Sequence, residues 1–231
     1  MQLLIAATML VIWAFSAQAQ CRQALALGLD VSGSVDSGEY RLQLDGLAAA
    51  LDAPEVRQTL LGLPNYPVRI LIYEWSGPRQ FNRRVLVNWT AIRDASSLAD
   101  VVARLRGTKR RQADPSTALG TALVFGAKTL ASQADCPRRT LDISGDGKSN
   151  TGPRPQDVQS PDWLTVNGLT IGAGRDGADP SLQELSAYYL ANVIRGPGAF
   201  VETAQDFEDY EQAMTRKLLR ELQGLSLAAL P

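Results

Sequence analysis

The sequence predicts an α/β domain with a doubly wound, mainly parallel sheet and helices on both of its faces. Along the chain, short apolar runs typical of buried strands alternate with segments whose apolar residues recur at helical spacing. Two of these runs end close to an aspartate, Asp30 and Asp146, and ligands in such sheets bind beyond the carboxyl ends of the strands. The chain of 231 residues is long enough for one domain with a sizeable core.

The first predicted strand is the apolar run at residues 24–30, and a helix is expected near residues 38–51. The apolar residues of this helix fall on one face: Tyr40, Leu44, Leu47, Ala48 and Leu51. Asp36 and Glu39 have the spacing of a capping box at its start.

The next strand, at residues 68–75, is expected to pair with residues 84–89 across a turn at Gly77 and Pro78. This pairing gives the sheet one antiparallel edge strand. The remaining elements are expected in the following order: helices at about 96–106 and 116–132, strands at 139–144 and 163–171, a helix near 180–191, a strand at 199–203 and a closing helix at 207–222. The first of these helices stops at Gly107, a residue typical of helix ends.

Residues 1–19 contain no charged side chain and are interpreted as a signal peptide. An apolar stretch at residues 3–15 precedes the sequence Ser-Ala-Gln-Ala, which fits cleavage after Ala19. The stretch is too short to span a membrane comfortably, so no stable membrane span is expected after cleavage. We therefore expect an exported protein, periplasmic or secreted, with a single domain at residues 20–231.

The composition excludes several classes of site. The chain has no histidine, which removes Ser-His-Asp and Cys-His nucleophiles and histidine-based zinc sites. Two cysteines cannot form a zinc ribbon, so any metal site must be built from oxygen atoms. A formal net charge of −1 argues against a nucleic-acid partner, because bulk nucleic-acid binders are normally strongly basic.

A group of oxygen-bearing side chains follows the first predicted strand. Asp30, Ser32 and Ser34 occur on alternate residues, and in a turn alternate side chains can converge on one point. Oxygen-only ligation of this kind suits a hard divalent cation. Thr117 and Asp146 offer further oxygens from two later segments.

These five residues together resemble the metal-ion-dependent adhesion site (MIDAS) of von Willebrand factor type A (vWA) domains. The motifs that carry the resemblance are Asp30-x-Ser32-x-Ser34, Thr117-x-x-Gly120 and Asp146-Gly147. Leu119 and Gly145 depart from the family pattern, since threonine is usual at both positions. The resemblance covers nearly the whole chain after residue 19 and implies the Rossmann-like vWA fold. More narrowly, the chain resembles an uncharacterised group of exported bacterial proteins with this domain (DUF1194-like), which supplies no activity.

The resemblance implies that Ser32, Ser34 and Thr117 hold Mg²⁺, or Mn²⁺ or Ca²⁺, directly or through water, while Asp30 and Asp146 supply charge. It also implies that an Asp or Glu of a protein partner completes the coordination of the ion. The expected function is therefore a protein-binding module and not an enzyme. A simpler interpretation is that the hydroxyls only cap turns and helices, or that the site folds but binds little metal.

Two other functions stay open at this stage. A Mg²⁺-dependent hydrolase of phosphate esters would need a base beside the ion, and the nearby candidates are Asp36, Asp114 and Asp142. A structural subunit would use the metal only to stiffen its loops. Asp142 lies inside a predicted strand and requires a buried partner.

The resemblance also bears on the two cysteines. In this family the strands that carry the two aspartates are parallel neighbours, so Cys21 and Cys136 fall near their amino ends. Because export makes oxidation possible, we expect a Cys21–Cys136 disulfide with a stabilising role.

Three further features have ordinary interpretations beside a functional one. Gly172-x-Gly174-x-x-Gly177 matches a dinucleotide fingerprint, but Pro180 is expected to start the following helix, which leaves these glycines in a loop.

The basic residues of one segment either stabilise a helix end or steer an acidic partner: Arg104, Arg106, Lys109, Arg110 and Arg111. Three aromatic residues are interpreted as core or sheet-edge packing: Trp163, Tyr188 and Tyr189.

Overall fold

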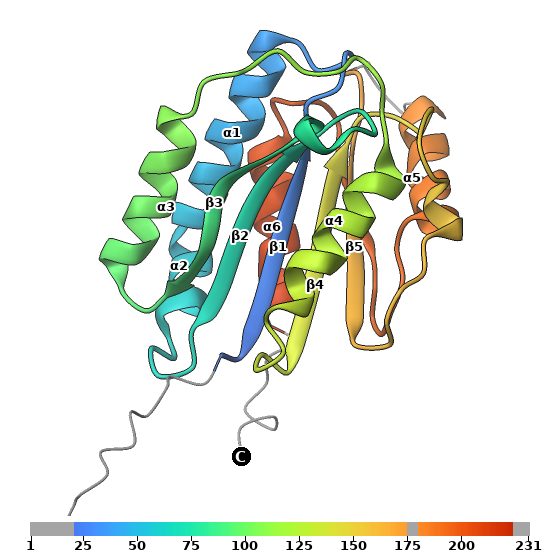
Figure 1. Ribbon diagram of the computed structural model, residues 1–231. Coiled ribbons are helices and arrows are strands. Elements are labelled where there is room, and N and C mark those ends of the chain that lie inside the picture. Colours follow the sequence, from blue (N-terminus) through green and yellow to red (C-terminus); the bar gives the residue numbers. More distant parts are fainter. Residues whose placement is uncertain (1–20, 175–179, 224–231) are drawn as a thin grey trace, which may run out of the picture.

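A six-stranded sheet covered by helices on both faces forms the described part of the chain, residues 21–174 and 180–223 of the computed structural model (Figure 1). The strands in sheet order are β3 (Arg83–Ile92), β2 (Val68–Trp75), β1 (Gln23–Asp30), β4 (Arg138–Gly145), β5 (Leu164–Ile171) and β6 (Val201–Ala204). Only β3 is antiparallel to its neighbour; all other adjacent strands are parallel. The predicted fold class is confirmed. The predicted signal peptide, residues 1–19, lies outside the described residues.

The central strand β1 is buried along its whole length, which explains its nearly continuous apolar sequence. Leu25, Leu27 and Leu29 point to one face of the sheet, whereas Ala24 and Ala26 point to the other. Because side chains alternate along a strand, β1 contributes to two separate hydrophobic clusters.

Helices cover both faces (Figure 1). On the face of the leucines lie α1 (Ser37–Asp52), α2 (Pro54–Leu61), α3 (Ala95–Gly107) and α6 (Tyr210–Gln223). On the opposite face lie α4 (Leu119–Ala131) and α5 (Pro180–Asn192). Two short 3₁₀ helices, η1 (Gln80–Asn82) and η2 (Pro155–Asp157), occur in the connections. The described residues contain no helix that is long and apolar enough to cross a membrane.

Helix α2 is absent from the sequence prediction. It has eight residues, and only Val56 and Leu60 are buried, so its periodic signal is short. Pro54 occupies its first turn, where a missing N–H costs no hydrogen bond. The capping box predicted for α1 is confirmed, because the Asp36 side chain accepts from the Glu39 N–H and the Glu39 side chain accepts from the Asp36 N–H.

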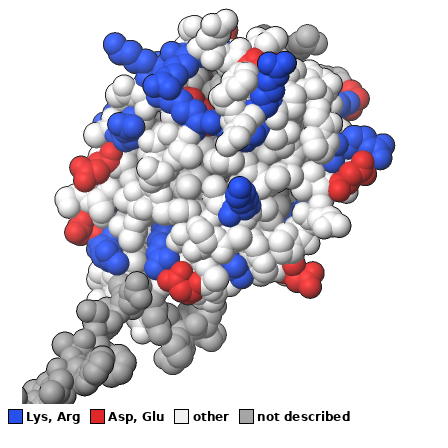
Figure 2. All heavy atoms as spheres, in the orientation of Figure 1, with Lys and Arg blue, Asp and Glu red and all other residues white. Residues whose placement is uncertain are grey.

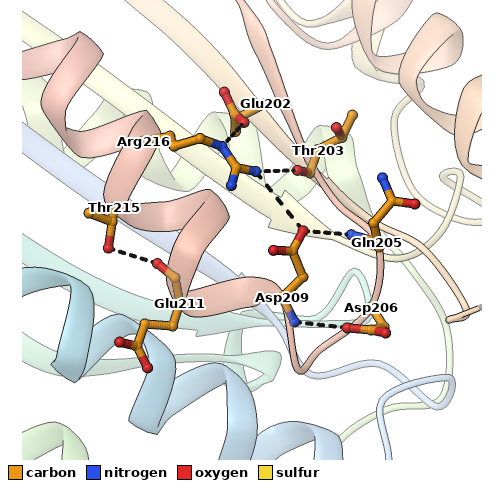
Figure 3. Close-up of polar contacts among 8 residues, drawn as sticks. All are labelled: Glu202, Thr203, Gln205, Asp206, Asp209, Glu211, Thr215 and Arg216. Carbon is orange, nitrogen blue, oxygen red and sulfur yellow. Dashed lines mark hydrogen bonds and ion pairs between the residues drawn. The ribbon is translucent and has the colours of Figure 1, made fainter.

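Helix α6 begins at Tyr210, three residues later than predicted, because side chains hold the preceding residues in a turn (Figure 3). Asp206 Oδ1 accepts from the Asp209 N–H at 2.8 Å, and Asp209 Oδ2 accepts from the Gln205 N–H at 3.0 Å. From the second turn of the helix, Arg216 pairs with Glu202 of β6 at 2.9 Å. These contacts fix the start of α6 against β6.

A buried ion network joins α6 to the sheet. Lys217 Nζ lies 3.0 Å from Asp142 Oδ1 of β4 and 2.9 Å from Glu221 Oε1, and all three side chains are buried. Asn167 of β5 donates to Glu221 Oε1 at 2.6 Å. The buried partner that Asp142 requires is therefore Lys217.

The expected disulfide is present between Cys21 and Cys136, whose Cα atoms are 4.8 Å apart. Both cysteines are buried. They immediately precede β1 and β4 at the amino ends of these strands, so the bond lies at the end of the sheet away from Asp30 and Asp146.

Candidate metal site

Three loops meet at the carboxyl ends of β1 and β4, and together they carry the five predicted metal ligands. This is the position where the strand order reverses, since β1 has β2 on one side and β4 on the other. In open α/β sheets this crevice is the usual ligand site. The sheet topology thus places Asp30 and Asp146 at the same edge.

The first loop follows β1. Asp30 is fully buried, and its Oδ1 accepts from the Ser32 N–H at 2.8 Å, which turns the chain sharply. The Ser32 and Ser34 hydroxyl oxygens are 3.3 Å apart. The alternate side chains of this loop therefore converge, as the sequence predicts.

The second loop precedes α4 and carries Thr117, which is buried. Its Oγ1 lies 3.3 Å from the Ser32 Oγ. Helix α4 begins at Leu119 rather than near Ser116, because Ala118 has non-helical backbone angles, φ −108° and ψ 66°. The N–H groups of Thr117 and Ala118 bond to Asn150 Oδ1 and to the Ser76 carbonyl.

The third loop follows β4. Asp146 Oδ1 accepts from the Ser34 hydroxyl at 2.8 Å. Ser32, Ser34, Thr117 and Asp146 are thus linked by hydroxyl contacts, and the backbone of Ser32 links this group to Asp30. The structure brings all five predicted residues together in one cluster.

The oxygen set fits a hard divalent cation. Among the described residues, no group of three or more His, Cys, Asp or Glu side chains could hold a metal, so an ion here would depend on two carboxylates together with three hydroxyls. Asp30 Oδ2 is buried and has no hydrogen-bond partner within the described residues. A buried carboxylate oxygen normally has a partner, so this atom marks an incomplete site.

The electrostatics agree with that chemistry. Burial, and then repulsion from Asp146, raises the pKa of Asp30 to about 8. Burial also raises the pKa of Asp146. Two carboxylates held close together in a low-dielectric site favour a cation between them.

Asn150 is a site residue that the sequence analysis missed. Its side chain accepts from the Thr117 N–H at 2.9 Å, and its own N–H donates to the Thr117 carbonyl at 2.9 Å. Asn150 belongs to no motif, and its contact with Thr117 spans 33 positions of sequence, so no local pattern indicates it.

The candidate bases of a hydrolase have other roles. Asp36 caps α1, and Asp142 pairs with Lys217 on the α6 face of the sheet. Asp114 accepts from the N–H and the hydroxyl of Ser116, which lowers its pKa. A lowered pKa makes a weaker base.

A pocket of about 440 Å³ borders the cluster on the α5 side. Its lining includes Ser34, Asp146, Lys148 and Glu184. The predicted glycine loop at 172–177 adjoins it in part, and residues 175–177 of that loop lie outside the described residues. Helix α5 begins at Pro180 as expected.

A second pocket of about 440 Å³ lies on the side of the β2–β3 hairpin, with Val31, Arg84 and Arg111 in its wall, and none of the five predicted ligands lines it. Figure 2 shows Lys and Arg side chains gathered along this side of the carboxyl edge. Arg110 donates to the Asp36 carbonyl at 2.6 Å, whereas Arg104 donates to the Leu86 carbonyl at 3.1 Å. Arg110 therefore contacts the start of α1 beside the cluster, and Arg104 joins α3 to β3.

Comparisons with known proteins agree with this architecture. A family described as "Protein of unknown function (DUF1194)" matches residues 20–226. No curated protein matches the sequence significantly.

Three solved structures are similar in fold. Proximal thread matrix protein 1 from the mussel byssus, with a zinc-occupied MIDAS motif, has a TM-score of 0.60 at 14% identity over 89% of this chain and 47% of its own. A von Willebrand factor type A protein from Catenulispora acidiphila has a TM-score of 0.54 at 15% identity over 87% of this chain and 43% of its own. The pilus adhesin SpaC from Lactobacillus rhamnosus GG has a TM-score of 0.58 at 13% identity over 89% of this chain and 30% of its own. The chain spans less than half the length of each, and the likeness shows the fold.

Proposed function

The chain belongs to the DUF1194 family and has a vWA-like fold, and on that premise we propose that it is an exported binding module that engages a protein partner through a bound divalent cation. The ion is held by Asp30, Ser32, Ser34, Thr117 and Asp146. An Asp or Glu of the partner supplies a further ligand. The domain extends over residues 20–231 and follows a signal peptide at residues 1–19.

One observation carries the proposal. Three loops that are far apart in sequence place five oxygen-bearing side chains in one hydrogen-bonded cluster, and Asp30 Oδ2 is buried there without a partner among the described residues. If these residues only capped turns, it would be unfavourable to bury the Asp30 carboxylate with no cationic side chain of the described residues beside it.

The chemistry of the cluster favours Mg²⁺, with Mn²⁺ and Ca²⁺ as the other candidates. Hydroxyl and carboxylate oxygens are hard ligands, and the sequence offers no imidazole or free thiolate to favour a softer metal. The bound ion would neutralise Asp30 and Asp146. It would also attract a third carboxylate, because two partly hydrated charges leave residual positive potential at the ion.

The proposed location is the periplasm or the extracellular space. The Cys21–Cys136 disulfide supports it, because structural disulfides persist in oxidising compartments. The engagement of Asp36, Asp114 and Asp142 in other contacts supports a binding role over hydrolysis.

Isothermal calorimetry of Mg²⁺, Mn²⁺ and Ca²⁺ into the chelator-stripped protein tests the proposal. Asp30→Ala and Thr117→Ala should each weaken binding, while Thr129→Ala, a threonine of α4 that bonds to the Gly126 carbonyl, should bind as the wild type does. Circular dichroism checks that every variant is folded. A folded wild type that binds none of the three ions would contradict the proposed site.

A further inference from the structure

Tyr189 of α5 lies in a slot that two strand glycines create. The ring is fully buried against the sheet. A Cβ atom added at Gly168 of β5 would be 2.8 Å from the Tyr189 Cδ1, and one added at Gly145 of β4 would be 2.6 Å from its hydroxyl oxygen. Glycine weakens a strand interior and often marks the close approach of another group. Both strands therefore lack a side chain where this ring lies.

The slot directs the phenol toward the candidate metal site. The position that a Cβ of Gly145 would occupy is 2.6 Å from the Tyr189 hydroxyl oxygen and 3.1 Å from Asp30 Oδ2. The two oxygens therefore flank the same small space at the carboxyl end of β4. Asp30 comes from β1 and Tyr189 from α5, so only the folded sheet brings them together.

Each of these oxygens is buried, and neither has a hydrogen-bond partner within the described residues. Two such atoms that border the same position are unusual, because buried polar groups are almost always paired with protein or ordered water. Their chemistry is complementary, since the phenol can donate and the carboxylate can only accept. A small movement, or one buried water between them, would satisfy both.

We propose that Tyr189 is a positioning residue of the metal site, whose hydroxyl donates to Asp30 Oδ2 directly or through one buried water. This contact fixes the orientation of the Asp30 carboxylate. The inference rests on the proposed function, because it assigns the Asp30 carboxylate to the ion. Hydrogen-bonding partners behind a metal ligand commonly change metal affinity by about 10–100-fold.

The first test compares Mg²⁺ and Mn²⁺ affinities by calorimetry for the wild type, Tyr189→Phe and Tyr188→Phe. Tyr189→Phe removes one oxygen and leaves the ring in its slot, so affinity should fall by about tenfold or more while the thermal midpoint changes little. Tyr188→Phe is the matched control, because Tyr188 is adjacent on α5 and only half-buried. Equal affinities for wild type and Tyr189→Phe would overturn the inference.

A double substitution distinguishes a positioning role of the Tyr189 hydroxyl from a packing role of the Tyr189 ring. In Tyr189→Phe the space beside Gly145 is vacated, and the added substitution Gly145→Ser returns a hydroxyl to it from β4. The double variant should recover much of the lost affinity, whereas Gly145→Ser alone should destabilise the protein by collision with Tyr189. If Tyr189→Phe weakens binding and the double variant recovers none of it in a folded protein, the loss does not come from a missing hydrogen bond to Asp30.

A measurement on the metal-free protein keeps this inference distinct from the proposed function. Proton NMR should show slowly exchanging phenolic hydroxyls of the other buried, hydrogen-bonded tyrosines, Tyr40, Tyr73 and Tyr210. The wild type and Tyr188→Phe should show one such signal more, that of Tyr189. The signal should be missing in Tyr189→Phe and exchange faster in Asp30→Ala. No Tyr189 signal in the wild type would refute the Tyr189 contact, whereas a protected Tyr189 signal without metal binding would refute the proposed function alone.

Discussion

Asn150 holds Thr117 through both of its backbone polar groups: the Asn150 side chain accepts from the Thr117 N–H, and the Asn150 N–H donates to the Thr117 carbonyl, each at 2.9 Å. These two hydrogen bonds resemble one residue pair of a β-ladder, but they form between two loops. They fix the backbone from which the Thr117 hydroxyl reaches Ser32. The position of this hydroxyl therefore depends on a residue that belongs to a different loop.

Asn150→Ala should weaken metal binding several-fold with a modest loss of stability. The variant leaves the Thr117 N–H without its acceptor, which costs about 0.5–1.5 kcal/mol, since Asn150 is exposed and water can replace it. Calorimetry with Mg²⁺ and urea denaturation measure the two effects. Asn150→Asp keeps the acceptor and serves as the control. Wild-type affinity in Asn150→Ala would show that the two loops hold their positions without this pair.

Lys217→Met should destabilise the fold by about 3–5 kcal/mol, because it leaves Asp142 and Glu221 buried without a cation. Urea denaturation of wild type and variant gives the difference in unfolding free energy. The triple variant Lys217→Met, Asp142→Asn, Glu221→Gln removes the charges together and should recover most of the loss. A small effect of Lys217→Met alone would indicate that water reaches the network.

Asp142 should make the unfolding free energy decrease between about pH 4 and pH 7, in addition to the decrease that the raised pKa of Asp30 causes. Burial raises the pKa of Asp142 from its ordinary value of 3.8 to about 7, against the opposing effect of Lys217. A raised folded-state pKa means that the folded chain keeps a proton which the unfolded chain has released, so this stabilising contribution is complete below about pH 4 and is lost as the pH rises toward 7.

The comparison that isolates Asp142 is urea denaturation of wild type and Asp142→Asn at several pH values across this window. The charged or titratable groups around Asp142 are Lys217 and Glu221 of α6, with Tyr210 of α6 and Tyr73 of β2. The asparagine variant should show a shallower decrease. Identical slopes for the two proteins would exclude Asp142 as the titrating group.

Replacing both cysteines by serine should lower stability by about 4–5 kcal/mol in the chain-entropy model, because the bond joins residues separated by 115 positions. Metal affinity should stay unchanged, since the disulfide lies at the opposite end of the sheet. Thermal denaturation and calorimetry test the two statements on the same samples. A fall in Mg²⁺ affinity in a folded double variant would show that the two ends of the sheet are coupled.

The strands and most helices could be predicted because their signals are local. β1 and β2 are mostly apolar and are buried along nearly their whole length, and α1 carries its own capping box. Helix α2 was missed, because eight residues with two buried side chains give a weak period. The starts of α4 and α6 were placed three residues early, because Ala118 has non-helical backbone angles and because Asp206 holds the residues before α6 in a turn.

Some residues of the candidate site could be predicted from the sequence, and others could not. Asp30, Ser32 and Ser34 form a compact motif. Thr117 and Asp146 were noted as further oxygens in two later segments, and the resemblance to vWA domains joins the five residues in one site. Asn150 and the slot of Tyr189 carry no such signal, since their meaning arises only when β4, β5 and α5 are packed. The sequence analysis interpreted Tyr189 as core packing, which its burial supports, but the position of its hydroxyl could not be read from spacing.

The arrangement of β1 has a mechanical consequence. A partner anchored at Asp30 would pull on the chain along the axis of β1, and this strand is bonded to β2 on one side and to β4 on the other. Tension in that direction must shear both ladders at once rather than open them one bond at a time. At the far end, Cys21 ties the strand covalently to the start of β4. The force would therefore pass from the ion into β1 and β4, and the Cys21–Cys136 disulfide would hold the amino ends of these two strands together.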